Sequence, residues 1–278
     1  MARSRRGSVP ERLIAVLITA AVVPGPPALV SELMGSAAPE LDDLRQAADR
    51  VVSLAVGDLT RVLADSPGSA SGLGSGSVQL VVVGPGEPGE FNATGPVSFA
   101  SFGRDVVVPA LVEGQPRDPE LPTPIMVARY LASRDLAAHP EHAQLWASAR
   151  WLTTSGTDAP ASGERLAADG MSVGLILVAD GAACRGLKAP RAQDERAQGY
   201  DEGVCAALAS GQPGRLAQID VDLGDELGAS GSQLWPLLVA AAAGDGIGEV
   251  LWAGAPYGVG WAVASWRHDP AERGPSHR

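Results

Sequence analysis

The sequence predicts an α/β fold, with one domain built on a central, mostly parallel β-sheet that has helices on both faces. Two short apolar runs, Val78 to Val83 and Ser172 to Ala179, are typical of strands covered on both faces. A long segment with helical periodicity lies between an earlier apolar run, Leu13 to Val23, and the run at Val78. The chain has 278 residues, of which 45% are apolar, and this is enough for a substantial core.

Leu13 to Val23 is expected to form the first strand and to end in the loop Pro24 to Pro27. The same run follows several arginines, so a secretory signal is an alternative interpretation. The run is too short to span a bilayer, which needs about 20 residues. The strand interpretation makes residues 1–12 a disordered extension, residues 13–266 the domain and residues 267–278 a disordered tail.

The segment from Pro39 to Asp65 has apolar residues at three- and four-residue steps and predicts one long amphipathic helix, with a break at Gly57 as an option. Ser66 to Ser77 is rich in Gly and Ser and predicts a flexible connector. Further strands are expected at 105–108, 151–154, 249–253 and 259–266. Further helices are expected at 124–136, 141–150, 164–168, 200–209, 214–219 and 232–243.

Charge and composition exclude several classes of function. The 32 acidic and 21 basic residues give a formal net charge of −11, which disfavours nucleic-acid binding, and no stretch is long enough to predict a membrane span. The two cysteines, Cys184 and Cys205, match neither a disulfide framework nor a zinc motif. They are typical of reduced thiols in a cytoplasmic protein.

Two short motifs have simpler interpretations than the functional ones. Gly84 to Gly89 fits a dinucleotide-binding glycine pattern, but prolines follow where that pattern needs the start of a helix, so a stiff loop is the better interpretation. His139 and His142 could share a helix face and hold a metal ion. With no third ligand evident, we expect them to be solvated histidines at a helix start.

Four loops follow apolar runs, at 24–27, 84–89, 180–184 and 254–258, and should line a crevice at the carboxyl edge of the sheet. These loops, with the segments LVADGAACRGLKAPRAQDERAQGYD at 177–201 and APYGVGWAVASW at 255–266, resemble the B-like catalytic subunits of the class III extradiol ring-cleavage dioxygenase superfamily, in its actinobacterial branch. The resemblance spans most of the chain from Leu13 to Trp266. It implies a single α/β domain and, because the family's enzymes often work as assemblies, a possible homodimer.

The resemblance also implies a non-haem Fe(II) held by two histidines and a glutamate, with a further histidine as acid/base. The first ligand would fall at Gly25 and the second at Gly84 to Gly86. The acid/base histidine would fall near Ala182 to Cys184 and the glutamate near Gln233. None of these donors is present, and ferrous iron needs such a set, so neither a metal nor another cofactor is expected.

The leading hypothesis is therefore a diverged relative without ring cleavage that binds a small molecule or a partner. Its predicted pocket lining is Pro24, Gly25, Pro26, Gly84, Gly86, Asp180, Arg185, Lys188, Gln233 and Tyr257. The simpler interpretation makes Arg185 and Lys188 solvated loop residues, and Tyr257 a turn residue packed between strands. Two alternatives stay open: a metal-independent enzyme that uses Asp180, and an active dioxygenase with other ligands, such as His139 and His142.

Overall fold

The computed structural model describes residues 16–65, 78–117, 121–168 and 170–268. The extension expected at 1–12 and the connector expected at Ser66 to Ser77 lie outside the described residues. Most of the expected tail does too, but β9 continues to His268, so the tail boundary predicted at residue 267 is wrong by two residues.

The sheet has seven strands in the order β3-β6-β2-β7-β1-β9-β8. Its strands are β1 (Val16–Val23), β2 (Val78–Pro85), β3 (Gly89–Phe91), β6 (Arg150–Thr154), β7 (Ser172–Val178), β8 (Gly246–Gly254) and β9 (Trp261–His268), while β4 (Val97–Ser98) and β5 (Val107–Val108) form a separate pair. The four central strands β6, β2, β7 and β1 run parallel, and β3 and the β9-β8 hairpin flank them antiparallel. The predicted α/β class is confirmed, with a parallel centre and antiparallel edges.

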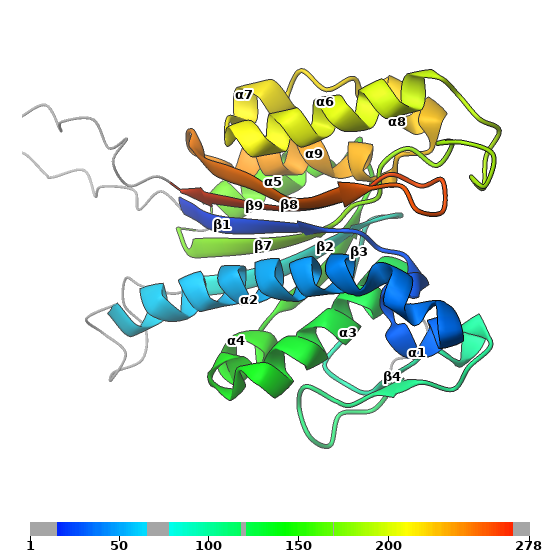
Figure 1. Ribbon diagram of the computed structural model, residues 1–278. Helices are drawn as coiled ribbons and strands as arrows, with labels where there is room; N and C mark the ends of the chain where they lie inside the picture. Colours follow the sequence, from blue (N-terminus) through cyan, green and yellow to red (C-terminus); the bar gives the residue numbers. More distant parts are fainter. Residues whose placement is uncertain (1–15, 66–77, 118–120, 169, 269–278) are drawn as a thin grey trace, which may run out of the picture.

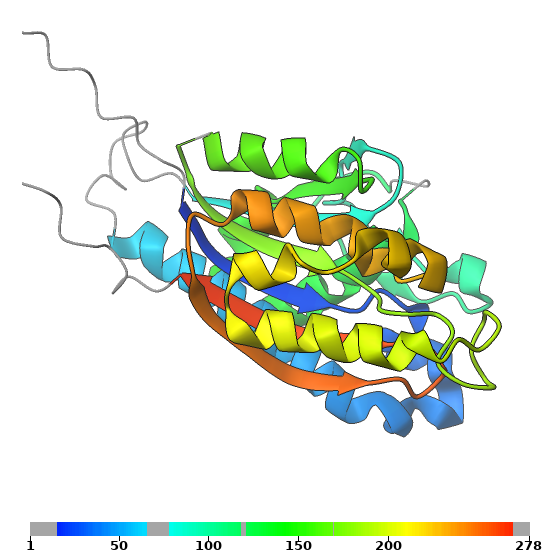
Figure 2. The ribbon, with the colours of Figure 1, turned by 90° about the horizontal axis from the view of Figure 1, so that it is seen from above.

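Helices cover both faces of the sheet, as Figure 1 shows. One face carries α2 (Asp42–Asp65), α3 (Thr123–Ala138), α4 (Ala143–Ala147) and the short η1 (Pro27–Leu29), α1 (Ser31–Met34), η2 (Gly35–Leu41), η3 (Ala100–Phe102) and η4 (Pro140–His142). The other face carries α5 (Ala159–Ala168), α6 (Arg196–Ser210), α7 (Pro213–Leu216), α8 (Val221–Leu227), η5 (Ser230–Leu234) and α9 (Trp235–Ala241). Figure 2, seen from above, shows α5, α9 and α6 lying along the sheet.

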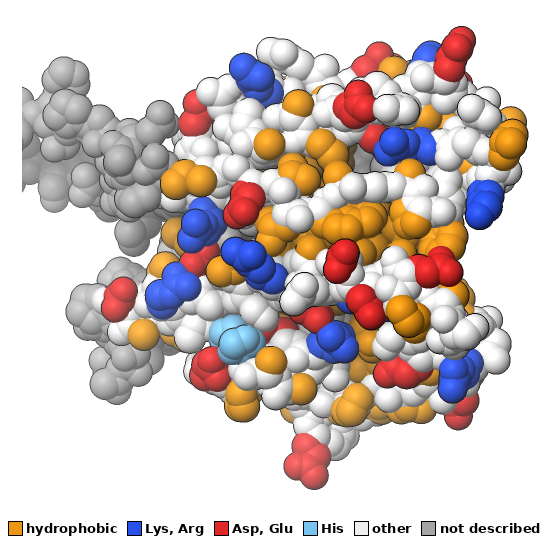
Figure 3. All heavy atoms as spheres, viewed as in Figure 1, with side chains coloured by type: hydrophobic (Ala, Val, Ile, Leu, Met, Phe, Trp, Pro, Cys, Tyr) orange, Lys and Arg blue, Asp and Glu red, His pale blue; other side chains and the backbone are white. Residues whose placement is uncertain are grey.

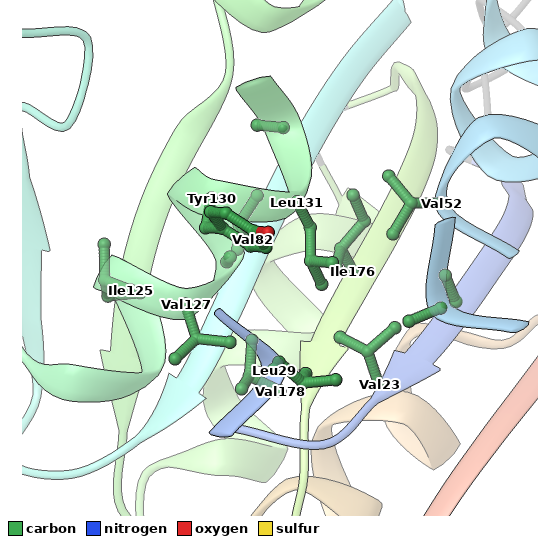
Figure 4. Packing of buried hydrophobic residues seen from close by; sticks show 14 of the residues in the cluster. Val23, Leu29, Val52, Val82, Ile125, Val127, Tyr130, Leu131, Ile176 and Val178 are labelled. Atoms are coloured by element: carbon green, nitrogen blue, oxygen red, sulfur yellow. The ribbon is translucent and has the colours of Figure 1, made fainter. Parts of the chain in front are cut away.

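The core lies on both faces of the sheet, which is why its central strands are continuous apolar runs. On the face under α2 and α3, Val23, Val82 and Ile176 point toward Val52 and Leu131 (Figure 4). The opposite face of the same strands buries Val22, Val83 and Leu175 against the second helix layer. The interpretation of Leu13 to Val23 as a strand is confirmed for the described residues, since β1 pairs with β7 and with β9.

Several elements differ from the prediction, and two of the differences have clear physical reasons. α2 runs without a break through Gly57, because its buried face packs on the sheet along the whole helix and offsets the roughly 1 kcal/mol helix penalty of one glycine. α8 was missed, although Asp220 caps it by accepting the Leu223 N–H at 2.9 Å and Gly228 ends it with φ 71°. The segment has only weak apolar periodicity, so the helix was missed although Asp220 and Gly228 are recognisable cap residues.

Candidate functional site

A cavity of about 260 Å³ opens at the carboxyl edge of the parallel strands, under α6. Val22 of β1, Ala179 at the end of β7 and the junction of β8 with β9 form its floor, and α6, η5 and α9 form its walls. Its polar or ionisable lining residues are Asp180, Arg185, Tyr200, Asp201, Glu202, Cys205, Ser232, Trp235 and Trp261. The position agrees with the rule that ligands bind outside the carboxyl ends of strands in α/β sheets.

Asp180 follows β7 directly, is half-buried and is one of the residues that line the cavity; its Oδ2 lies 3.7 Å from the position that a Cβ would take at Gly25. Its Oδ1 accepts the Gly25 N–H at 2.9 Å, and its backbone bridges to Trp261 at the start of β9. Within the described part of the chain, no cation is paired with its carboxyl group and Oδ2 has no hydrogen-bond partner. Burial raises the pKa of Asp180 to about 6, and the Gly25 N–H opposes this rise only in part.

Asp201, on the first turns of α6, is a second carboxylate of the cavity lining, next to the exposed Glu202. Its Oδ1 accepts the Ala182 N–H at 2.9 Å and its Oδ2 accepts from Nη1 of Arg185 at 3.2 Å. Burial raises the pKa of Asp201, while Ala182 and Arg185 lower it. The only arginine that lines the cavity is therefore already paired, and the described lining keeps an excess of negative charge.

Two buried polar groups of the cavity wall lie near each other without good partners. Among the described residues, neither Oη of Tyr200 nor Nε1 of Trp235 makes a hydrogen bond of regular geometry. Burial raises the pKa of Tyr200 to about 12, and the indole of Trp235 lowers it only slightly, so the phenol stays protonated at neutral pH. A buried hydroxyl or indole N–H left unpaired costs about 1–3 kcal/mol, which a ligand or water could recover.

Of the ten predicted lining residues, the structure brings only Asp180 and Arg185 to this cavity. Pro24 and Gly25 are buried behind it, Pro26 is half-buried, and Gly25 touches the cavity only through Asp180. Gly84 and Gly86 lie at the end of β2 and beyond it, outside the cavity. Their predicted place in the lining is wrong, because the first turn of α3 lies over the end of β2.

Lys188, Gln233 and Tyr257 are corrected in the same way. Lys188 is exposed on the loop before α6, as the simpler interpretation predicts. Gln233, in η5, packs beside Gly156 rather than into the cavity. Oη of Tyr257 donates to Glu40 at 2.8 Å and its ring meets Trp261 edge-on, so Tyr257 ties the β8-β9 turn to η2.

The Fe(II) that the resemblance implies does not fit the residues present. A Cβ at Gly84 would lie 2.6 Å from Cβ of Pro124, and a Cβ at Gly25 would lie 2.8 Å from Cγ1 of Val178. Cys184 is buried, with Sγ directed at the Leu227 carbonyl at 3.4 Å. The positions expected to hold iron therefore lack donors, and at two of them packing also excludes a larger side chain.

The two histidines do not supply a substitute ligand set at the expected iron position near Gly84. The first turn of α3 contacts Gly84 through Pro124, whereas His139 follows its last residue. A rise of 1.5 Å per residue separates the ends of this 16-residue helix by roughly 24 Å. The prediction that both histidines are solvated is wrong for His142, which is 4% exposed.

The sequence reasoning missed Tyr200, Asp201, Cys205 and Trp235, which form much of the cavity wall. One signal was present, since Asp201, Cys205 and Leu208 recur at steps of four and three residues and so share one face of α6. A carboxylate on an otherwise apolar helix face indicates a partner or a ligand. Both cysteines are free, as expected.

Comparison with known proteins adds little. No protein-family model matches the chain, and no curated protein does. Among solved structures, an uncharacterized protein from Escherichia coli K12 is similar at a TM-score of 0.37 and 14% identity, over 90% of this chain and 99% of that chain. A TM-score of this size supports no conclusion about function.

Proposed function

We propose that the chain is a small-molecule-binding protein, on a scaffold that resembles the class III extradiol dioxygenases, and that it lacks iron-dependent ring cleavage. The observation that carries the proposal is the cavity at the carboxyl edge, whose lining includes Asp180, a residue whose Oδ2 has no hydrogen-bond partner among the described residues. A deep carboxyl group without a cation costs stability, and a bound cation or hydrogen-bond donor would offset that cost.

The lining also supports a class of ligand. The walls contain Val22, Val204, Leu208 and Trp235, so the body of the ligand should be apolar. Asp180 should bind a protonated amine or a hydroxyl donor, because the nearby Arg185 is already paired with Asp201. A volume of about 260 Å³ suits a molecule of roughly the size of one aromatic ring with a short side chain.

Titration calorimetry and thermal denaturation of the full chain with tyramine, benzylamine and 4-methylcatechol test the proposal. We expect at least one amine to bind and to raise the Tm. Because a charge-assisted hydrogen bond is worth about 1.5–3 kcal/mol, Asp180→Asn should weaken binding of the amine by roughly 10- to 100-fold. Asp43→Asn, which changes an exposed carboxylate on α2, is the matched control.

Failure of all three probes to bind, or equal amine affinity in wild type and Asp180→Asn, would overturn this assignment of the cavity. We also expect protein purified without air and loaded with Fe(II) to consume no oxygen when 4-methylcatechol is added. Oxygen consumption that depends on iron would instead support the alternative of an active dioxygenase with other ligands.

The pKa of Asp180 favours one further candidate, a metal-independent enzyme. A carboxyl group with a pKa of about 6 in a cavity can exchange protons near neutral pH. A bound amine converted to product, with a rate that depends on a group titrating near pH 6 and is lost in Asp180→Asn, would favour this candidate over simple binding.

Cellular location and partners remain proposals. In the described part of the chain, no helix combines the length and apolar character needed to cross a bilayer. We propose a cytoplasmic protein that does not bind nucleic acid, in line with its net charge of −11. We also propose a homodimer, for which the free edge of β8 is the candidate contact.

A further inference from the structure

A cluster of imidazole and carboxylate groups lies at the end of α3 far from the cavity. His139, Glu141 and His142 each place a potential ligand atom within 4.8 Å of the others, and no other such group occurs in the ranges that the structure describes. The two imidazole rings stack with centroids 5.0 Å apart. Glu141 lies beside His139, with Oε1 3.3 Å from Nδ1.

A buried network fixes the orientation of His142. Oδ2 of Asp135 lies 2.9 Å from Nδ1 of His142 and accepts the indole N–H of Trp146 at 2.7 Å, while Oδ1 accepts the Ser53 hydroxyl at 2.6 Å. Because the Asp135 carboxylate accepts from Nδ1, the neutral ring keeps its lone pair on Nε2. A carboxylate behind an imidazole in this way is the usual second layer of a metal site.

Nε2 of His142, on a side chain that is only 5% exposed, is directed at α2. Gly57 of α2 faces it, and a Cβ at that position would only come into ordinary contact with Nε2, at 3.8 Å. Nη2 of Arg61 would lie 3.8 Å from the same Cβ, while Nη1 pairs with Asp58 and the side chain is 66% exposed, so this arginine borders the site. Apart from Asp135, which Ser53, His142 and Trp146 already satisfy, no further described carboxylate hydrogen-bonds to His142.

We propose that His139, Glu141 and Nε2 of His142 bind a divalent transition metal of the zinc class, with water in the remaining position. Two imidazoles and one carboxylate form an accepted zinc ligand set, with bonds of about 2.0–2.2 Å. The side chains of His139 and Glu141 are 42% and 60% exposed, so they can close by the small movement that such bonds need, while His142 stays fixed. The site is independent of the proposed ligand cavity.

The experiment uses the full chain after dialysis against EDTA, with ZnCl2 in titration calorimetry and CoCl2 in visible absorption spectroscopy. We expect a single equivalent of metal to bind and Co(II) to give ligand-field bands of low coordination number. His139→Ala and Glu141→Gln alter exposed side chains and should fold normally. Because each removes one of three ligands, we expect each to weaken binding at least tenfold.

Asp135→Asn tests the positioning role of the buried carboxylate and should weaken metal binding 10- to 100-fold, as such outer partners do. Circular dichroism of this variant separates loss of metal from loss of fold. Asp43→Asn is the control for general loss of negative charge. Absence of a stoichiometric metal, or unchanged binding in both His139→Ala and Glu141→Gln, would show that the cluster is only a hydrogen-bonded helix end.

Discussion

The backbone N–H of Gly25 donates a hydrogen bond of 2.9 Å to Oδ1 of Asp180, and this contact joins the loops that follow the neighbouring strands β1 and β7. It holds one oxygen of the carboxyl group in place, and the other, Oδ2, lies 3.7 Å from the position that a Cβ would take at Gly25. A residue without a side chain at position 25 thus positions the residue on which the proposed function depends.

The ionisation of Asp180 should make the protein less stable as the pH rises. Its pKa is about 6 in the folded protein against an ordinary value of 3.8, so the folded state holds this proton to a higher pH than the unfolded chain. The contribution is fully favourable below about pH 4 and is lost as the pH rises to about 6. The difference of roughly two pKa units corresponds to about 3 kcal/mol.

Asp180→Asn isolates this effect, because asparagine keeps an oxygen for the Gly25 N–H but carries no charge. In urea denaturation at pH 8 we expect the variant to be more stable than wild type, by up to about 3 kcal/mol. At pH 4.5, where the unfolded chain has already lost most of this proton, the difference should shrink to about 1 kcal/mol. A difference that is the same at both pH values would contradict the raised pKa.

Gly84→Ala should destabilise the fold by about 1–3 kcal/mol through overpacking, because its Cβ would lie 2.6 Å from Cβ of Pro124. Gly199→Ala is the matched control, since Gly199 is exposed in α6 with nothing within 4 Å of a Cβ. Helix propensity should make that variant more stable by up to about 1 kcal/mol. Equal Tm values for the two variants would show that the start of α3 can shift away from position 84 at little cost in stability.

Tyr200→Phe should preserve or raise the stability of the ligand-free protein, by about 1 kcal/mol, since the hydroxyl it removes is buried without a regular hydrogen bond among the described residues. Tyr130→Phe is the comparison, because Oη of Tyr130 lies within hydrogen-bond distance of Ser31 and Glu32. That variant should lose stability. Urea denaturation of both checks the pair, and a clear loss in Tyr200→Phe would mean that the phenol has a structural partner.

The proposed homodimer predicts that Ile247→Lys produces monomers. β8 pairs only with β9 among the described strands, and Ile247 on this edge is 53% exposed. Figure 3 shows hydrophobic side chains gathered along this side of the sheet. A lysine on an edge strand opposes pairing with another strand. Analytical sedimentation measures the oligomeric state of wild type and variant. A wild type that stays monomeric at high concentration would contradict the proposed homodimer.

The fold was largely predictable because strands buried on both faces leave a plain apolar signal. Ser172 to Ala179 and Val78 to Val83 became the centre of the sheet. Short elements were less predictable, because α8 and β3 depend on capping and edge pairing rather than on periodicity. Gly57 suggested a break that does not occur, because helix propensity is weak compared with packing along 24 residues.

The candidate site was predictable only where a polar residue directly follows a buried strand, as Asp180 does. Its partners come from helices far along the chain, and the angle at which α6 crosses the sheet decides that Asp201 and Tyr200 reach the cavity. No local pattern encodes that angle. The same holds for Asp135, whose position beside His142 depends on how η4 folds back on α3.

The position of Pro124 between Gly84 and the loop at Gly25 also has an evolutionary consequence. One histidine codon at position 84 or 25 would not by itself create an iron ligand, because the new side chain would meet Pro124 at position 84 and Val178 at position 25. A histidine at position 84 would need the backbone of α3 to move away from it at the same time. Descendants of this chain would therefore gain new chemistry at other positions more readily than an iron site at these two.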